Sequence, residues 1–160
     1  MSDYLVYDVF TDTAFGGNQL AVFLNAQDLP QDRLQQIAAE FNFSEVTFVY
    51  PPENKNHTAK VRIFTPTSEV DFAGHPVIGS VIALAGLGYD APMILELGVG
   101  PMPCEITGGR AAFTTSVPLE LFAQPDNELI ARALGLPKSD IKTDIHPPQQ
   151  ASLGLPFTLV

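Results

Sequence analysis

The sequence has few of the features that mark extracellular or membrane-spanning proteins. It holds a single cysteine, Cys104, and so cannot form an internal disulfide, which favours a reducing compartment. No run of apolar residues approaches the length that a membrane-spanning helix needs. The opening segment Met1–Tyr4 lacks the charged and apolar regions of a signal peptide. From these absences we expect a cytoplasmic protein.

Basic residues are also scarce, which bears on the class of partner. Eight lysines and arginines stand against 18 aspartates and glutamates, giving a formal net charge of -10. Nucleic acids and anionic membranes both attract basic surfaces, so we expect neither as a partner. A small anionic ligand stays possible, because the first backbone N–H groups of a helix can bind one locally. The 160 residues are 46% hydrophobic, which is typical of a globular chain with a real core.

Metal binding and covalent catalysis find little support in the residues. The histidines, His57, His75 and His146, are far apart and form no recognised metal-ligand motif, so we expect no metal. Cys104 follows Pro103 in an apolar segment, where an inert buried thiol is the usual case. The hydroxyl of Ser44 lacks the glycine surroundings of a nucleophile elbow.

Hydrophobic patterning predicts an α+β fold. The segment 77–87 is apolar with few charges on any side, which indicates a helix enclosed by a sheet. Segments rich in β-branched and aromatic residues predict short strands around it. We therefore expect a curled, mostly antiparallel sheet around the central helix 77–87. The strands are expected at 4–10, 20–24, 45–50, 58–64, 93–97, 102–106 and 110–116, with a further helix at 31–41.

The last quarter of the chain has a different organisation. Segment 118–125 reads as a connector, and 127–134 as a short helix closed by Gly135. Strands are expected at 141–145 and 155–160. An apolar strand is seldom left as a bare end, since an unpaired edge invites association. We therefore expect either a truncated product or an end that pairs with another chain.

Two segments offer residues suited to acid–base chemistry. Gly74 and His75 precede Pro76, where a loop enters the central helix, and a helix start can hold a carboxylate or an enolate-like oxygen. Glu45 opens a strand among apolar neighbours, which suits a general base. His75 could then act as an acid or as a donor to an oxyanion, and the helix dipole would lower its pKa. The alternatives are a surface glutamate and an ordinary helix start with a surface histidine. The glycine-bearing loop before Asn18 is either a turn or a rim that offers an amide to a ligand.

Taken together, three segments carry a resemblance to a known family. These are Val9-Phe10-Thr11 through Ala21-Val22, Asn42-Phe43-Ser44-Glu45-Val46-Thr47-Phe48, and Arg62-Ile63-Phe64 running on to Gly74-His75-Pro76. The chain resembles the PhzF-like isomerases of phenazine biosynthesis, relatives of diaminopimelate epimerase.

The resemblance implies two similar α+β halves with an active site in the cleft between them. It makes Glu45 the acid/base residue and places His75 in the site. It also matches Ser44 and Gly74 to ligand-contacting positions, and Asn18 to a loop asparagine. The implied reaction needs no cofactor: a proton leaves one carbon of a small carboxylate substrate and returns to another carbon or to the opposite face.

Family members are about twice as long as this chain. The resemblance therefore divides it into an N-terminal epimerase-like domain, 1–117, and a connector with the start of a truncated second domain, 118–160. Without the second half we expect Glu45 to be open to water and catalysis to suffer. Two chains could build a cleft by pairing, so we expect a homodimer. The alternative is a catalytically inactive binding or assembly module that keeps the fold. A cysteine-based racemase would need two cysteines, and the chain has only Cys104.

Overall fold

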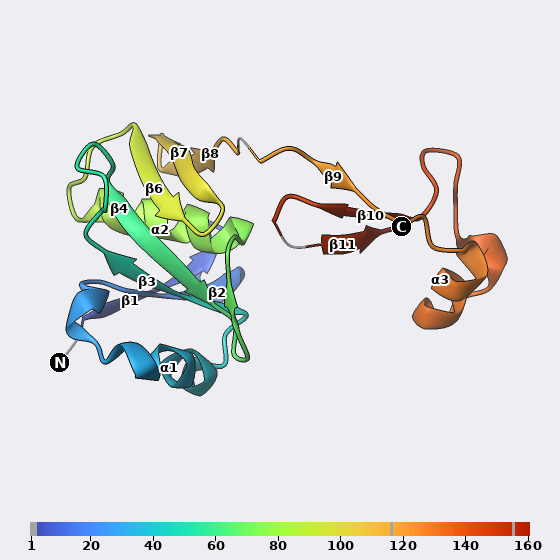
Figure 1. Ribbon diagram of the computed structural model, residues 1–160, viewed down its shortest axis with the longest axis horizontal. Coiled ribbons are helices and arrows are strands. Elements are labelled where there is room, and N and C mark those ends of the chain that lie inside the picture. Colours follow the sequence, from blue (N-terminus) through green and yellow to red (C-terminus); the bar gives the residue numbers. More distant parts are fainter. Residues whose placement is uncertain (1–2, 116, 155) are drawn as a thin grey trace. The chain divides into compact units, whose positions relative to one another are not determined.

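The computed structural model describes residues 3–115, 117–154 and 156–160 (Figure 1). Internal packing divides the chain into two compact units, Met1–Ser116 and Val117–Val160. Whether the expected boundary after residue 117 separates two domains stays a prediction. Within the described ranges, no helix combines the length and apolar character that crossing a membrane requires.

The first unit is a curled eight-stranded sheet with one helix, α2 (Gly74–Gly86), inside the curl. The strand order is β1-β2-β3-β4-β6-β7-β8, and β5 pairs with β4 off this path. Neighbouring strands are antiparallel except for the β2–β3 and β4–β6 pairs, which are parallel. These findings confirm the α+β class and the curled, mostly antiparallel sheet. The strands are β1 (Tyr4–Val9), β2 (Asn18–Phe23), β3 (Glu45–Tyr50), β4 (Ala59–Phe64), β5 (Glu69–Val70), β6 (Met93–Leu97), β7 (Gly100–Thr107) and β8 (Arg110–Phe113).

The apolar character of α2 explains its central place. Val77, Val81 and Leu84 are buried against the concave face of the sheet and form the main core with its inward-facing residues. Helices that are apolar on every side are stable only when they are enclosed, as this one is. Figure 1 shows α2 between β6–β7 and β1–β2.

The start of α2 differs from the expected residue 77. The helix begins at Gly74, after an extended Ala73 (φ -150°, ψ 141°), and it ends at Gly86. Pro76 is thus the third helical residue. A proline is tolerated throughout the first turn, because the N–H groups there have no acceptor inside the helix. The expected start was wrong by three residues, and the correction places Gly74 and His75 within the helix.

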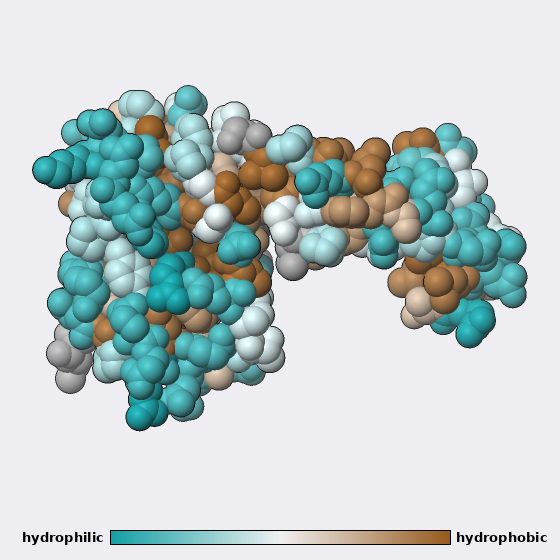
Figure 2. Space-filling view, in the orientation of Figure 1, coloured by the Kyte–Doolittle hydropathy of each residue, from teal (hydrophilic) through white to brown (hydrophobic). Residues whose placement is uncertain are grey.

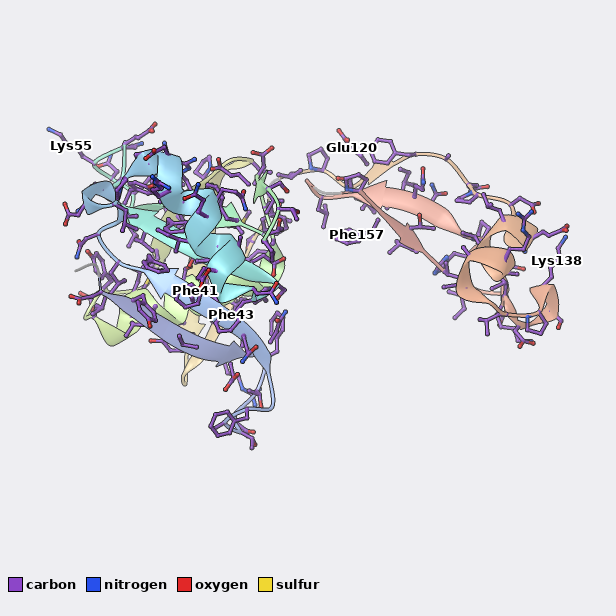
Figure 3. The ribbon with its side chains drawn as sticks, turned by 90° about the horizontal axis from the view of Figure 1, so that it is seen from below. Phe41, Phe43, Lys55, Glu120, Lys138 and Phe157 are labelled. Atoms are coloured by element: carbon purple, nitrogen blue, oxygen red, sulfur yellow. The ribbon has the colours of Figure 1, made fainter. Side chains whose placement is uncertain are left out.

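A second layer covers the outer face of the sheet. A 3₁₀ turn (Gln31–Arg33) leads into α1 (Leu34–Phe41), and α1 buries Leu34 and Ala38 in a separate apolar cluster with residues of β2, β3 and β4. Phe41 and Phe43 lie beside each other at its end, with ring centroids 5.5 Å apart (Figure 3). Strand β3 is therefore covered on both faces, by α1 on one side and α2 on the other.

The second unit contains a small antiparallel sheet and one helix. The strand order is β11-β10-β9, from β9 (Glu120–Leu121), β10 (Gln149–Ser152) and β11 (Pro156–Leu159). Helix α3 (Asn127–Leu134) has the expected bounds: the Asp126 side chain accepts from the Glu128 N–H at 2.8 Å, and Gly135 ends the helix in the left-handed region. Apolar patches alternate with hydrophilic areas on this unit's visible surface (Figure 2). Leu121 and Phe157 are among its exposed large apolar residues.

Two expectations for this unit were wrong. Segment 141–145 is not a strand, because Ile141 packs against Ile130 and Ala131 of α3, while Ile145 is 92% exposed. Among the described residues, no strand pairs with this segment. The expected connector 118–125 contains β9, and β10 was not expected at all. Strand β11 lies within the expected segment 155–160, of which residue 155 lies outside the described residues.

Candidate active site

The parallel pairing of β2 and β3 brings two polar residues together at the start of both strands. Leu20 of β2 is the register partner of Glu45, so Asn18 at the start of β2 lies near Ser44, directly before β3. The Ser44 hydroxyl donates to the Asn18 side-chain oxygen at 2.7 Å. This bond turns the amide oxygen of Asn18 toward Ser44 and its NH₂ group away. The amide donors are therefore free to point at a ligand.

Glu45 and His75 meet where β3 faces the start of α2. Glu45 Oε2 lies 3.2 Å from His75 Nδ1, and the side chains are 19% and 7% exposed respectively. Among the described residues, neither Glu45 Oε2 nor His75 Nε2 has a hydrogen-bond partner, although both atoms are buried. Buried polar atoms without partners are rare, and they concentrate at sites that complete their bonding with a ligand or water. The expectation that Glu45 is open to water was wrong, because β3 and α2 already cover most of it.

The electrostatics of the pair favour a neutral imidazole. Burial lowers the pKa of His75, and this outweighs the Glu45 charge and the Gln19 backbone, which both raise it. The expected direction is confirmed, but its main cause is burial rather than the helix dipole. A neutral histidine can accept a proton on one ring nitrogen and donate one from the other. The pair therefore combines a carboxylate with a group able to relay a proton.

The first turn of α2 presents free backbone donors next to this pair. Ala73, the residue before the helix, has no side-chain oxygen to cap the N–H groups, and Pro76 has no N–H of its own. A Cβ added to Gly74 would have as its nearest neighbour the Phe113 ring at 3.9 Å, which is an ordinary contact. The glycine thus leaves the space of a methyl group open beside the helix start. A carboxylate could approach the Gly74 and His75 N–H groups here.

The structure thus brings together all five site residues expected from the sequence, at the starts of β2, β3 and α2. Their roles stay predictions. The sequence analysis missed Thr47 and Ser80, whose buried hydroxyls lie behind the Glu45–His75 pair. The alternation of β3, which puts Glu45 and Thr47 on one face, was the signal available for Thr47.

Other chemistries find less support in the described residues. Cys104 is buried, and burial raises the pKa of its thiol to about 11, so it stays protonated near neutral pH. Within ranges 3–115, 117–154 and 156–160, no three His, Cys, Asp or Glu side chains are grouped as metal ligands.

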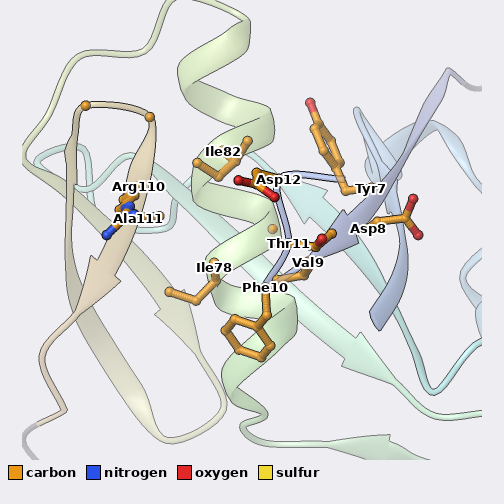
Figure 4. A pocket seen from close by; sticks show the side chains of 13 residues that line it. Tyr7, Asp8, Val9, Phe10, Thr11, Asp12, Ile78, Ile82, Arg110 and Ala111 are labelled. Carbon is orange, nitrogen blue, oxygen red and sulfur yellow. The ribbon is translucent and has the colours of Figure 1, made fainter. Parts of the chain in front are cut away.

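A separate pocket of about 760 Å³ opens between β1, α2 and the β7–β8 turn (Figure 4). Phe10, Ile78 and Arg110 are among its lining residues. Its lining includes neither Glu45 nor His75. Among the described residues, no ion pair joins two side chains that line this pocket. We therefore place the candidate reacting centre at Glu45 and His75 rather than in this pocket.

Comparison with known proteins agrees with the resemblance in the sequence. Residues 7–160 match the family model PhzC-PhzF, described as phenazine biosynthesis-like protein. The chain belongs to the PhzC-PhzF family. This PhzC-PhzF chain is 40% identical over 166 aligned residues to an uncharacterised isomerase of Mesorhizobium japonicum, covering 99% of the chain and 55% of the relative. It is 37% identical to the trans-2,3-dihydro-3-hydroxyanthranilate isomerase of Pseudomonas fluorescens, covering 98% of the chain and 58% of that enzyme.

Solved structures of other proteins share the fold of this chain. A predicted epimerase of Pseudomonas aeruginosa superposes with a TM-score of 0.83 at 30% identity, over 99% of this chain and 58% of the other. The chain spans little more than half the length of the relatives it matches. General isomerase character is supported for the family, whereas the reaction of this chain is a matter for proposal.

Proposed function

We propose that this chain is the N-terminal half of a PhzF-like, cofactor-independent isomerase or epimerase, in which Glu45 transfers a proton. The observation that carries the proposal is the 3.2 Å contact between Glu45 Oε2 and His75 Nδ1 at the start of α2. Among the described residues, Glu45 Oε2 and His75 Nε2 are both buried and lack a hydrogen-bond partner. A substrate would satisfy these atoms, as water or a ligand does at other sites of this kind.

The geometry supports a simple sequence of proton transfers. The substrate carboxylate accepts hydrogen bonds from the backbone N–H groups of Gly74 and His75 and from the Asn18 amide. The Glu45 carboxylate removes a proton from a substrate carbon, and the electrons of the C–H bond move into the conjugated system. The resulting anion is stabilised by the positive end of the α2 dipole. Protonated Glu45 then returns the proton to another carbon or to the opposite face, so no electrons leave the substrate.

The neutral His75 would support this cycle in two ways. With its single N–H at Nδ1, the ring orients the Glu45 carboxylate, and the unprotonated Nε2 can accept a hydrogen bond or a proton from the substrate. Because burial keeps the imidazole neutral, His75 does not neutralise the negative charge of Glu45, and this charge stays available for the reaction with the substrate.

The substrate class follows from the relatives and the site together. The Pseudomonas fluorescens relative carries trans-2,3-dihydro-3-hydroxyanthranilate in its name, and that compound has a ring carboxylate. We propose this compound, or a similar small carboxylate, as the substrate, with turnover in the cytoplasm. We further propose that a second copy of the chain supplies the other wall of the site in a homodimer. A binding or assembly module without catalysis is the alternative, and the test below separates the two.

The test follows deuterium uptake from D₂O into 2,3-dihydro-3-hydroxyanthranilate by mass spectrometry. Wild type should label the substrate, whereas Glu45→Gln should lower the rate by roughly 100-fold to 10,000-fold. Glu40→Gln, at an exposed position on α1, is the matched control and should label at the wild-type rate. Equal labelling by Glu45→Gln would refute the role of Glu45. Binding without labelling by wild type would favour the non-catalytic module.

A further inference from the structure

Two buried hydroxyl groups join β3 to α2 directly behind the candidate site. Thr47 and Ser80 are both 0% exposed. The Ser80 hydroxyl donates to the Thr47 hydroxyl at 3.2 Å, and the Thr47 hydroxyl donates to the Ala21 backbone carbonyl at 3.4 Å. The chain of bonds therefore runs from α2 through β3 to β2, inside an otherwise apolar core.

The location of these hydroxyls argues for a role beyond stability. Among the described residues of the first unit, the buried polar side chains are Thr47, His75 and Ser80, and all three lie where β3 meets α2. Replacing both partners of such a bond with apolar groups of the same shape is often nearly neutral or stabilising. A buried polar bond does, however, fix which groups face each other.

Two contacts join β3 to α2, and they are separated by similar distances along the two elements. Glu45 and Thr47 are two residues apart on β3, so they share a face and lie about 6.7 Å apart along the strand. His75 and Ser80 are five residues apart on α2, which is about 7.5 Å along the helix axis and about 140° around it, so they reach β3 from opposite edges of the buried helix face. The first contact is between Glu45 and His75, and the second is the hydrogen bond between Thr47 and Ser80. A slip of α2 by one residue would shift both contacts by about 1.5 Å along the helix and turn the side chains by about 100° around it.

Close packing at Gly79 adds to this alignment. A Cβ at Gly79 would lie 2.4 Å from Leu20 Cδ2, so the helix backbone rests directly on β2 next to Ser80. Leu20 is in turn the register partner of Glu45 in β3. Helix α2, β2 and β3 therefore pack against one another immediately beside Glu45 and His75.

We propose that Thr47 and Ser80 are positioning residues, which hold α2 on β3 so that His75 meets Glu45. The catalytic meaning of this pair rests on the proposed function, but the alignment itself does not. The test therefore begins with a measurement that needs no substrate.

The first readout is the NMR chemical shift of the His75 ring nitrogens. Introduced into the otherwise wild-type chain, Glu45→Gln removes the carboxylate beside Nδ1 and should shift these signals. In Thr47→Val, which keeps the shape and loses the hydroxyl, that shift should fall to less than half of its wild-type size. Thr47→Ser, which keeps the hydroxyl and loses a buried methyl, should retain it. Val61→Ala, a buried change in β4 without a hydrogen bond to α2, is the control and should retain it as well.

The opposite order would overturn the proposal. A purely structural role predicts that Thr47→Ser, with its lost methyl, disturbs His75 more than Thr47→Val does. A full Glu45→Gln effect in folded Thr47→Val would show that the hydroxyl pair does not position the site. Where wild type labels its substrate, Thr47→Val should lower kcat by roughly 10-fold to 100-fold with KM unchanged. If wild type labels nothing, the NMR comparison still decides the alignment.

Discussion

The close packing of α2 against the sheet can be tested by adding a single methyl group at Gly79. In Gly79→Ala the new Cβ would lie 2.4 Å from Leu20 Cδ2 and 3.0 Å from Val9 Cγ2. Leu20 is 0% exposed, so its methyl group can only move aside within the core and not into solvent. The helix must lift from β2, or Leu20 must leave its preferred rotamer.

Two opposing contributions set the magnitude. Overpacking of a well-filled core costs about 1–3 kcal/mol. Alanine is favoured over glycine within a helix by about 1 kcal/mol, which offsets part of that cost. We expect Gly79→Ala to lower the free energy of unfolding by about 0–2 kcal/mol, the difference of these two terms.

The matched control is Gly86→Ala at the exposed end of the same helix. There the added Cβ would meet only the Tyr7 hydroxyl oxygen at 4.0 Å, so the substitution should keep the helix-propensity gain and stabilise the chain by about 1 kcal/mol. Urea denaturation of the two variants gives the steric cost as their difference, which we expect to be about 1–3 kcal/mol. If Gly79→Ala were as stable as Gly86→Ala, or more stable, the close packing of α2 against Leu20 would be refuted.

Three further predictions concern the site. Burial lowers the folded-state pKa of His75, so the unfolded chain takes up a proton first as the pH falls below about 6.5. Wild type should therefore lose stability below that pH, and denaturation of His75→Gln should show a flatter profile; equal slopes would contradict the buried neutral imidazole. Gly74→Ala should unfold within about 1 kcal/mol of wild type, since its Cβ meets Phe113 only at 3.9 Å, yet should raise KM for a carboxylate substrate; an unchanged KM would place the ligand elsewhere. Sedimentation at micromolar concentration should give the mass of a dimer, and a monomeric mass would end the proposal that two copies share the site.

Much of the fold could be predicted because its pattern is local. The uniform apolar character of α2 indicated a helix inside a sheet, and β3 was expected with its observed bounds, Glu45–Tyr50. The start of α2 was misjudged because Pro76 can stand anywhere in a first turn. β9 and β10 were missed because one has two residues and the other begins with Gln149 and Gln150, so neither shows a hydrophobic alternation.

The candidate site could be predicted less directly. Glu45 and His75 are 30 positions apart in the sequence, and no periodicity links them; residue chemistry suggested them as partners, and the resemblance to a family placed both at one site. The Thr47–Ser80 bond lay beyond the sequence for the same reason, since the partner of a buried hydroxyl depends on how helix and sheet pack. The burial of Glu45 by its own half of the site is likewise a result of that packing.

The central claim is that a carboxylate binds at the start of α2, against Glu45 and His75. It is tested most directly by titrating the ¹⁵N-labelled chain with anthranilate, a stable aromatic carboxylate, and following the backbone amide signals. We expect saturable shifts at Gly74 and His75, with little change at His57, whose ring contacts Glu96 in another part of the first unit. Shifts confined to the pocket around Phe10 and Arg110, with Gly74 and His75 unmoved, would contradict the account.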